Sequence, residues 1–139
     1  MQLVMFHSTG NERNVMGMKT VLIVDKSTAM RQLLSFALKD AGYWVVSAAS
    51  KEDAVDTLDG SKIEMVISGL SENKEGTAFI KEVRSKEDYR FTPIVILTAD
   101  SRETKSYRAT KSGANAFIMK PFTPKQLLEV VRHFSRPGF

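Results

Sequence analysis

The sequence contains no cysteine and only two histidines. The missing cysteine excludes disulfide bonds, thiolate catalysis and zinc–thiolate sites. His7 and His133 stand at opposite ends of the chain, so a histidine-based metal cluster is not expected.

The sequence also lacks a long hydrophobic run and a strong charge of one sign. No apolar stretch approaches the ~20 residues that span a bilayer, and no basic leader precedes a long apolar segment. We therefore expect a cytoplasmic protein without membrane contact. The net charge of +4 is mild and its basic residues are mixed with acidic ones. A nucleic-acid binder usually concentrates its basic residues in one stripe, so no nucleic-acid partner is expected.

The composition is that of one ordinary globular domain. The chain has 139 residues, of which 42% are hydrophobic and 26% charged, and this is typical of a single soluble unit with its own core. We expect a flexible leader at 1–18, in which Met18 is a candidate for the true start. One folded domain at 19–134 and a short tail at 135–139 are expected to follow.

Five short apolar stretches alternate with five segments of helical periodicity. Strands are expected at 20–24, 43–49, 63–68, 94–98 and 114–119. Helices are expected from about 28 to Gly42, from Ser50 to Gly60, from 77 to 86, from 101 to 112 and from Thr123 to Phe134. This alternation predicts an α/β fold in which a parallel sheet is wound on both faces.

Candidate functional residues follow the predicted strands, because ligands of such sheets bind at the carboxyl ends of the strands. Four strand ends should meet at this edge, and they carry Asp25–Lys26, Ser68–Gly69, Thr98–Ala99 and Lys120–Pro121. Gly69 follows the run I-E-M-V-I-S, which reads as a buried strand that opens into a loop at its carboxyl end. Chemistry is therefore expected at a residue that has no side chain.

Three of these stretches resemble a known family. D-K-S-T-A-M-R after the first strand, L-T-A in the fourth and F-I-M-K-P-F in the fifth are similar to the receiver domain of two-component response regulators, especially its stand-alone CheY-like form. The resemblance covers about 19–134. It implies a flavodoxin-like, five-stranded single domain that acts in phosphorelay signal transduction.

The resemblance also implies roles for individual residues. In the family, an aspartate after the third strand accepts a phosphoryl group from a histidine kinase, and two acidic residues after the first strand help to bind Mg²⁺. Asp25 matches the first of these acids, but Lys26 stands where the second should be and Gly69 where the phosphorylated aspartate should be. A shorter loop before Gly76 allows an alternative alignment that puts Ser68 at the acceptor position. Neither choice supplies an aspartate.

The remaining family positions are better matched. Thr98 matches the hydroxyl residue and Lys120 the lysine that contact the phosphoryl oxygens, and Phe117 matches the aromatic residue that changes rotamer on activation. Each has a purely structural alternative, namely a loop hydrogen bond for Thr98, an ion pair with Asp25 for Lys120 and a place in the core for Phe117. The family also implies a cis peptide bond before Pro121.

Charge argues against a metal at this site. The family pocket has three carboxylates and one lysine, whereas this one has one carboxylate and two ammonium groups, Lys26 and Lys120. Each unit of charge at about 4 Å is worth about 4 kcal/mol at an effective dielectric constant near 20. We predict weak or absent Mg²⁺ binding and no other cofactor. One hypothesis places the ammonium of Lys26 or Lys120 against Asp25, and the alternative leaves Lys26 in solvent.

The helix expected at 101–112 carries a possible partner surface. Its basic residues recur at helical spacing, with an aromatic nearby: Arg102, Lys105, Tyr107, Arg108 and Lys111. A solvated charged face is the simpler interpretation. In receivers, however, this helix and the fifth strand belong to the output surface, so the basic residues suggest a protein partner that is acidic where it makes contact.

The sequence therefore favours a non-enzymatic signalling module that is not phosphorylated at Gly69 and works through protein–protein contacts, including association with a histidine kinase. One alternative is a phosphorylation-competent receiver with an unconventional acceptor. Another is a nucleotide-binding or enzymatic α/β domain, but the first strand–helix turn, K-S-T-A-M, has no glycine-rich phosphate cradle. The partner and the oligomeric state are not indicated.

Overall fold

The computed structural model describes residues 17–71, 75–109 and 113–137, with the side chains of 106–109 left out. Most of the expected leader and part of the expected tail lie outside these residues. None of the described helices is long and apolar enough to cross a bilayer.

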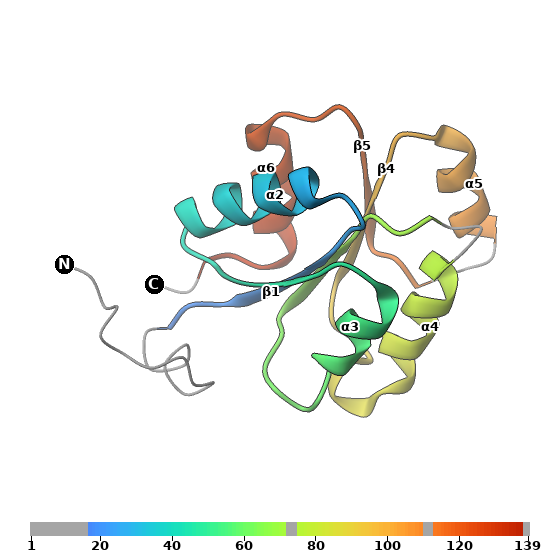
Figure 1. Ribbon diagram of the computed structural model, residues 1–139, viewed down its shortest axis with the longest axis horizontal. Helices are drawn as coiled ribbons and strands as arrows, with labels where there is room; N and C mark the ends of the chain where they lie inside the picture. The colour runs from blue at the N-terminus through green and yellow to red at the C-terminus, as the bar shows by residue number, and fades with distance from the viewer. Residues whose placement is uncertain (1–16, 72–74, 110–112, 138–139) are drawn as a thin grey trace.

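Five parallel strands form one sheet (Figure 1). They are β1 (Thr20–Val24), β2 (Trp44–Ala48), β3 (Met65–Ser68), β4 (Ile94–Thr98) and β5 (Ala116–Met119). The order across the sheet is β2-β1-β3-β4-β5. Every residue of β1, β3 and β4 is buried, as expected for strands covered on both faces. This confirms the predicted doubly wound fold of flavodoxin-like topology.

Helices cover both faces of the sheet (Figure 1). They are α2 (Thr28–Asp40), α3 (Lys51–Asp56), α4 (Thr77–Ser85), the short 3-10 helix η3 (Glu87–Tyr89), α5 (Ser101–Ala109) and α6 (Pro124–Phe134). Leu34 and Leu38 of α2 share a core with Leu127 and Val131 of α6. A second core, on the opposite face, contains side chains from α3 and α4.

Helix starts follow their sequence signals. Ser27 caps α2 by accepting a hydrogen bond from the backbone N–H of Met30, and Thr123 and Gln126 form a capping box at α6 with Pro124 at its first position. Side-chain oxygens at these positions satisfy backbone donors that the helix itself leaves unpaired. The turn after α2 uses Gly42 with φ +98°, a conformation that favours glycine.

Three strands begin later than the sequence suggests. Tyr43 ends the turn after α2, since its N–H bonds to the carbonyl of Leu38 and its buried hydroxyl donates to the carbonyl of Ser135. The third strand begins at Met65 rather than at 63, and the fifth at Ala116 rather than at 114. At the fifth, the Asn115 side chain accepts the N–H of Ile94. The helix expected to reach 112 is described to Ala109, and 110–112 lie outside the described residues.

Candidate functional site

The predicted residues do meet at the carboxyl edge of the sheet. The hydrogen-bond ladder continues one residue past the strands: Asp25 donates to Ala48 at 3.1 Å, Gly69 to Val24 at 2.8 Å and Lys120 to Thr98 at 2.8 Å, each from its backbone N–H to a carbonyl. The positions of Asp25, Gly69 and Lys120 are therefore set by the sheet itself. The Lys120–Pro121 peptide bond is cis.

The Asp25 side chain lies over Gly69. A Cβ atom built on Gly69 would be 1.9 Å from Asp25 Oδ2 and 2.8 Å from its Cγ, so any side chain at 69 would require the Asp25 carboxylate to move. Asp25 is held from both sides, because its Oδ1 accepts the N–H of Ser27 at 2.8 Å and its carbonyl accepts from Arg31 at 2.6 Å. The residue is only 4% exposed. A carboxylate thus fills the space that an acceptor side chain would need.

Lys120 provides the charge that faces this carboxylate. Its Nζ lies 3.8 Å from Asp25 Oδ2, with the lysine side chain 29% exposed. This distance is an ion pair rather than a hydrogen bond, and Oδ2 has no hydrogen-bond partner among the described residues. Of the two ammonium groups considered above, the structure places Lys120 against Asp25.

Lys26 has a different partner. Its Nζ lies 2.8 Å from Glu75 Oε1, just before α4, and this close contact with a carboxylate raises the pKa of Lys26. The proposed pairing of Lys26 with Asp25 is therefore not the arrangement found. The alternative, in which Lys26 points into solvent, describes its exposure but not its partner: the side chain is 65% exposed and is ion-paired with Glu75. Sequence reasoning missed Glu75, since nothing in the periodicity of the loop shows where its side chain reaches.

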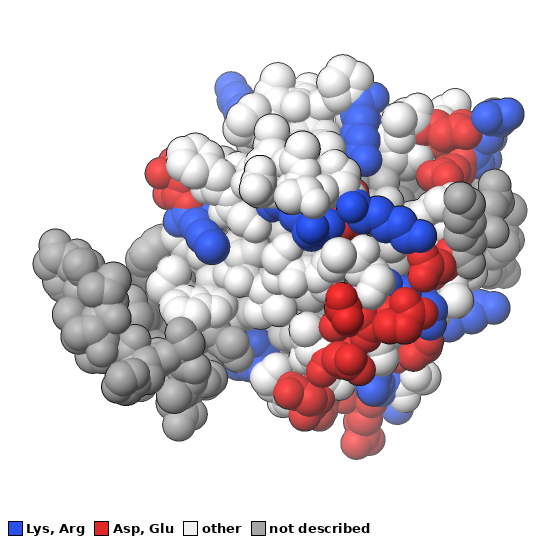
Figure 2. Space-filling model, in the orientation of Figure 1, with Lys and Arg blue, Asp and Glu red and all other residues white. Residues whose placement is uncertain are grey.

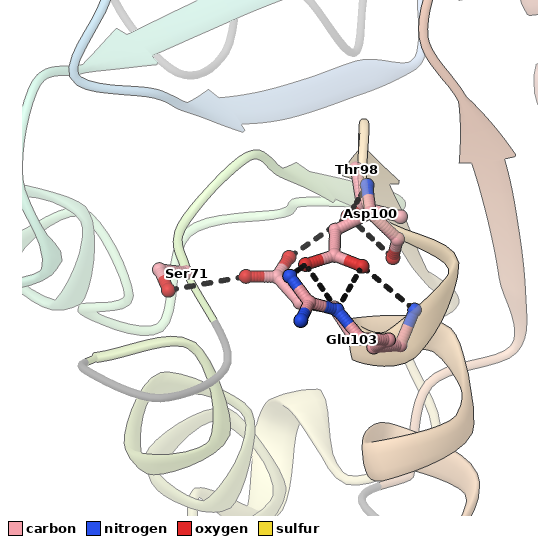
Figure 3. Close-up of polar contacts among 5 residues, drawn as sticks. Ser71, Thr98, Asp100 and Glu103 are labelled. Atoms are coloured by element: carbon pink, nitrogen blue, oxygen red, sulfur yellow. Dashed lines mark hydrogen bonds and ion pairs between the residues drawn. The ribbon is translucent and has the colours of Figure 1, made fainter.

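Thr98 donates its hydroxyl hydrogen to a carboxylate that the sequence did not single out (Figure 3). Glu103, in the first turn of α5, accepts it through Oε1 at 2.8 Å. Its other oxygen, Oε2, accepts from the Ser71 hydroxyl at 3.2 Å. Thr98 Oγ1 in turn accepts the N–H of Asp100 at 3.0 Å. Only the spacing L-T-A-D-S-R-E, with an acid in a first helical turn, could have drawn attention to Glu103.

The donor set does not fit Mg²⁺. Divalent magnesium prefers several oxygen ligands in octahedral array, whereas the nearby carboxylates are already engaged: Asp25 with Lys120, Glu75 with Lys26 and Glu103 with two hydroxyls. The described residues contain no group of three or more acidic or histidine side chains that could hold a metal ion.

The predicted output surface is only partly described. Phe117 is half-buried and packs against the core beneath α3 and α4. Arg102 forms an ion pair with Asp100 at 2.9 Å, and this bond holds the pKa of Asp100 below its usual range. Lys105 is exposed, and the side chains of Tyr107, Arg108 and Lys111 lie outside the described residues. On the face seen in Figure 2, acidic side chains gather over α3 and α4.

Comparison with known proteins agrees with this geometry. The profile of the response regulator receiver domain matches residues 21–132. The chain belongs to this family. A receiver domain of this kind acts in two-component signalling, in which it interacts with histidine kinases and other signalling partners.

Solved structures and curated relatives support the assignment. The structure of the Vibrio cholerae chemotaxis protein CheY4 is 35% identical, has a TM-score of 0.77 and is matched over 84% of this chain and 98% of its own. A putative response regulator from Chloroflexus aurantiacus is 30% identical, with a TM-score of 0.74 over 84% and 96%. The phosphate regulon transcriptional regulatory protein PhoB of Escherichia coli is 28% identical over 119 residues, which are 85% of this chain and 52% of PhoB. The receiver chain thus spans about half the length of the curated relatives it matches.

Proposed function

We propose that this receiver domain signals through protein–protein contacts without being phosphorylated at position 69, and that it is not an enzyme. The observation that carries the proposal is the carboxylate of Asp25, which fills the space next to Gly69. Aspartyl phosphorylation is an attack by a carboxylate oxygen on phosphorus. Glycine has no such oxygen, and Ser68, the alternative acceptor, is fully buried.

The charges around the site support the same conclusion. A phosphoryl group brings close to two negative charges at neutral pH. It would enter a site in which Asp25, Glu75 and Glu103 have already taken the neighbouring ammonium and hydroxyl donors. Weak or absent Mg²⁺ binding is part of the proposal, since the metal would have to displace these contacts as well.

The partner is a signalling protein that is acidic where it contacts α5. Lys105 is exposed on this helix, and Arg108 lies one turn further along it. Opposite charges across an interface mainly raise the association rate and exclude wrong partners. A histidine kinase is one candidate for this partner, because receiver domains of the family interact with such kinases.

Intact mass after incubation with acetyl phosphate tests the phosphorylation claim. The expected result is an unchanged mass, with a receiver domain that has an aspartate at the acceptor position as a positive control for the phosphodonor. An added phosphoryl mass would instead establish an unconventional acceptor. Loss of this mass at alkaline pH would indicate an acyl phosphate, as on Asp25, whereas an alkali-stable mass would indicate a serine ester, as on Ser68, and peptide mapping would identify the residue.

Charge reversal tests the contact surface. Captured partner should be lost when Lys105→Glu and Arg108→Glu are combined. The matched control combines Lys39→Glu and Lys62→Glu, two exposed lysines away from α5, and changes the net charge equally. Equal loss of binding in both variants would show a general charge effect and reject α5 as the contact surface.

A further inference from the structure

We infer that Glu103 acts as an internal anion that ties α5 to the loop between β3 and α4, so that this helix is held at the site without an added phosphoryl group. The inference rests on the proposed function, because it explains how a receiver that is not phosphorylated keeps its contact helix in place. Glu103 is a positioning residue, acting through Thr98 and Ser71.

The Glu103 carboxylate bridges two loops at the edge of the sheet (Figure 3). Oε1 accepts from Thr98, at the end of β4, and Oε2 accepts from Ser71, in the loop after β3. Hydrogen bonds to an ionised acceptor are about twice as strong as bonds between neutral groups. One side chain of α5 therefore links this helix both to the end of β4 and to the loop after β3.

The backbone places both hydroxyl residues beside Glu103. The Ser71 carbonyl accepts the N–H of Gly76 at 2.7 Å, which fixes the Ser71 backbone to the start of α4. Thr98 Oγ1 accepts the N–H of Asp100 at 3.0 Å, and its hydrogen has two acceptors within reach, Glu103 Oε1 at 2.8 Å and the Asp100 carbonyl at 3.2 Å. The carboxylate is the nearer acceptor and carries a charge, so it is favoured over the carbonyl.

The described side chains of α5, 101–105, make polar rather than apolar contacts. None of these five belongs to either hydrophobic core, whereas α2, α4 and α6 each bury two or more apolar residues. The Thr104 hydroxyl lies 3.8 Å from the sulfur of Met119, a weak acceptor. Among these first residues of α5, the two hydrogen bonds of Glu103 are therefore the strongest link to the neighbouring segments.

Hydrogen exchange of backbone amides in the full chain tests whether Glu103 holds α5 to the loop between β3 and α4. In Glu103→Ala, the amides of 69–71 and 101–105 should exchange roughly tenfold faster relative to those of β1, the size expected for losing a hydrogen bond to a charged acceptor. Glu103→Gln keeps an acceptor for Thr98, so its exchange rates at these amides should fall between those of the wild type and those of Glu103→Ala. Glu129→Ala, which removes an exposed carboxylate of α6, is the matched control.

Ser71→Ala provides a milder variant, since it removes only the Oε2 contact. It should speed exchange at 101–105, although Ser71 lies 32 residues from Glu103 in the sequence. Exchange at 101–105 that is the same in Glu103→Ala, Ser71→Ala and Glu129→Ala would overturn the inference. The measurement needs neither partner nor phosphodonor. Its failure would therefore leave the proposed function standing, and phosphoryl labelling of the wild type would reject the proposed function alone.

Discussion

The carboxylate of Asp25 lies where a Cβ atom on residue 69 would be, with Oδ2 1.9 Å from that position above Gly69. Glycine at 69 is therefore more than the loss of a nucleophile. It is the residue that allows Asp25 to turn inward and meet Lys120.

Replacing Gly69 with alanine should destabilise the domain by about 1–3 kcal/mol, the usual cost of overpacking a tight site. The added methyl group must displace the carboxylate of Asp25, which accepts the N–H of Ser27 and is paired with Lys120. Urea denaturation of the wild type and the variant measures the change. In an Asp25→Ala background the same substitution should cost much less, and an equal cost in both backgrounds would show that Asp25 is not the obstacle.

Magnesium should cause no saturable change at millimolar concentrations in the wild type. Lys26→Asp should bind the ion more tightly, because it removes an ammonium, adds a carboxylate and releases Glu75. Amide chemical shifts of Asp25 and Gly69 report on the site directly. Saturable millimolar binding by the wild type would contradict the expectation.

The fluorescence of Trp44 would be a poor reporter for that titration. Trp44 pairs with Thr20 at the start of the strands, whereas the site is at their carboxyl ends. Ala48 lies four residue steps along the strand from Trp44, a distance of about 13 Å.

Replacing Arg84 with lysine should lower the stability of the fold. The guanidinium donates to the carbonyls of Tyr89 and Thr92 with one nitrogen and to Gly113 and Asn115 with the other. An ammonium cannot reproduce this planar fork, so Arg84→Lys should cost about 2 kcal/mol of folding stability. The control Arg90→Lys, at an exposed arginine, should stay within about 0.5 kcal/mol. Similar denaturation midpoints for the two variants would count against the role of Arg84.

Acid should loosen the start of α5. Hydrogen bonds from the side chain and backbone of Arg102 lower the pKa of Asp100, so the unfolded state binds the proton more readily than the folded one. The contribution of Asp100 is therefore fully present above the ordinary aspartate pKa and is lost as pH falls through the lowered value. Amide exchange at 101–105, compared between wild type and Asp100→Asn, should converge at low pH. A constant difference between them across this pH range would exclude Asp100 as the titrating group.

Sequence periodicity predicted the sheet, its helices and the residues at its carboxyl edge. It succeeded there because buried strands such as β1 and β3 are continuously apolar, and because a parallel topology brings their ends together. It erred at Tyr43 and Asn115, where side-chain hydrogen bonds to distant backbone, rather than apolar character, decide where a strand begins.

The carboxylates that engage the donors of the site were harder to foresee. Lys26 was singled out, but its partner Glu75 is 49 residues away in the sequence, and Glu103 was not among the residues singled out from the sequence. Which donor a flexible glutamate side chain reaches depends on the conformation of its loop. A single sequence, read by itself, shows no repeating pattern that would reveal this conformation.

The contacts of α5 restrict how this helix can move. Glu103 holds its first turn to the β3–α4 loop through Ser71 and to the end of β4 through Thr98. Rotation of the helix about its own long axis would carry this carboxylate away from both hydroxyls. The side of the first turn that faces outward is therefore set by one half-buried carboxylate, and a partner that binds there meets a surface whose orientation is already fixed.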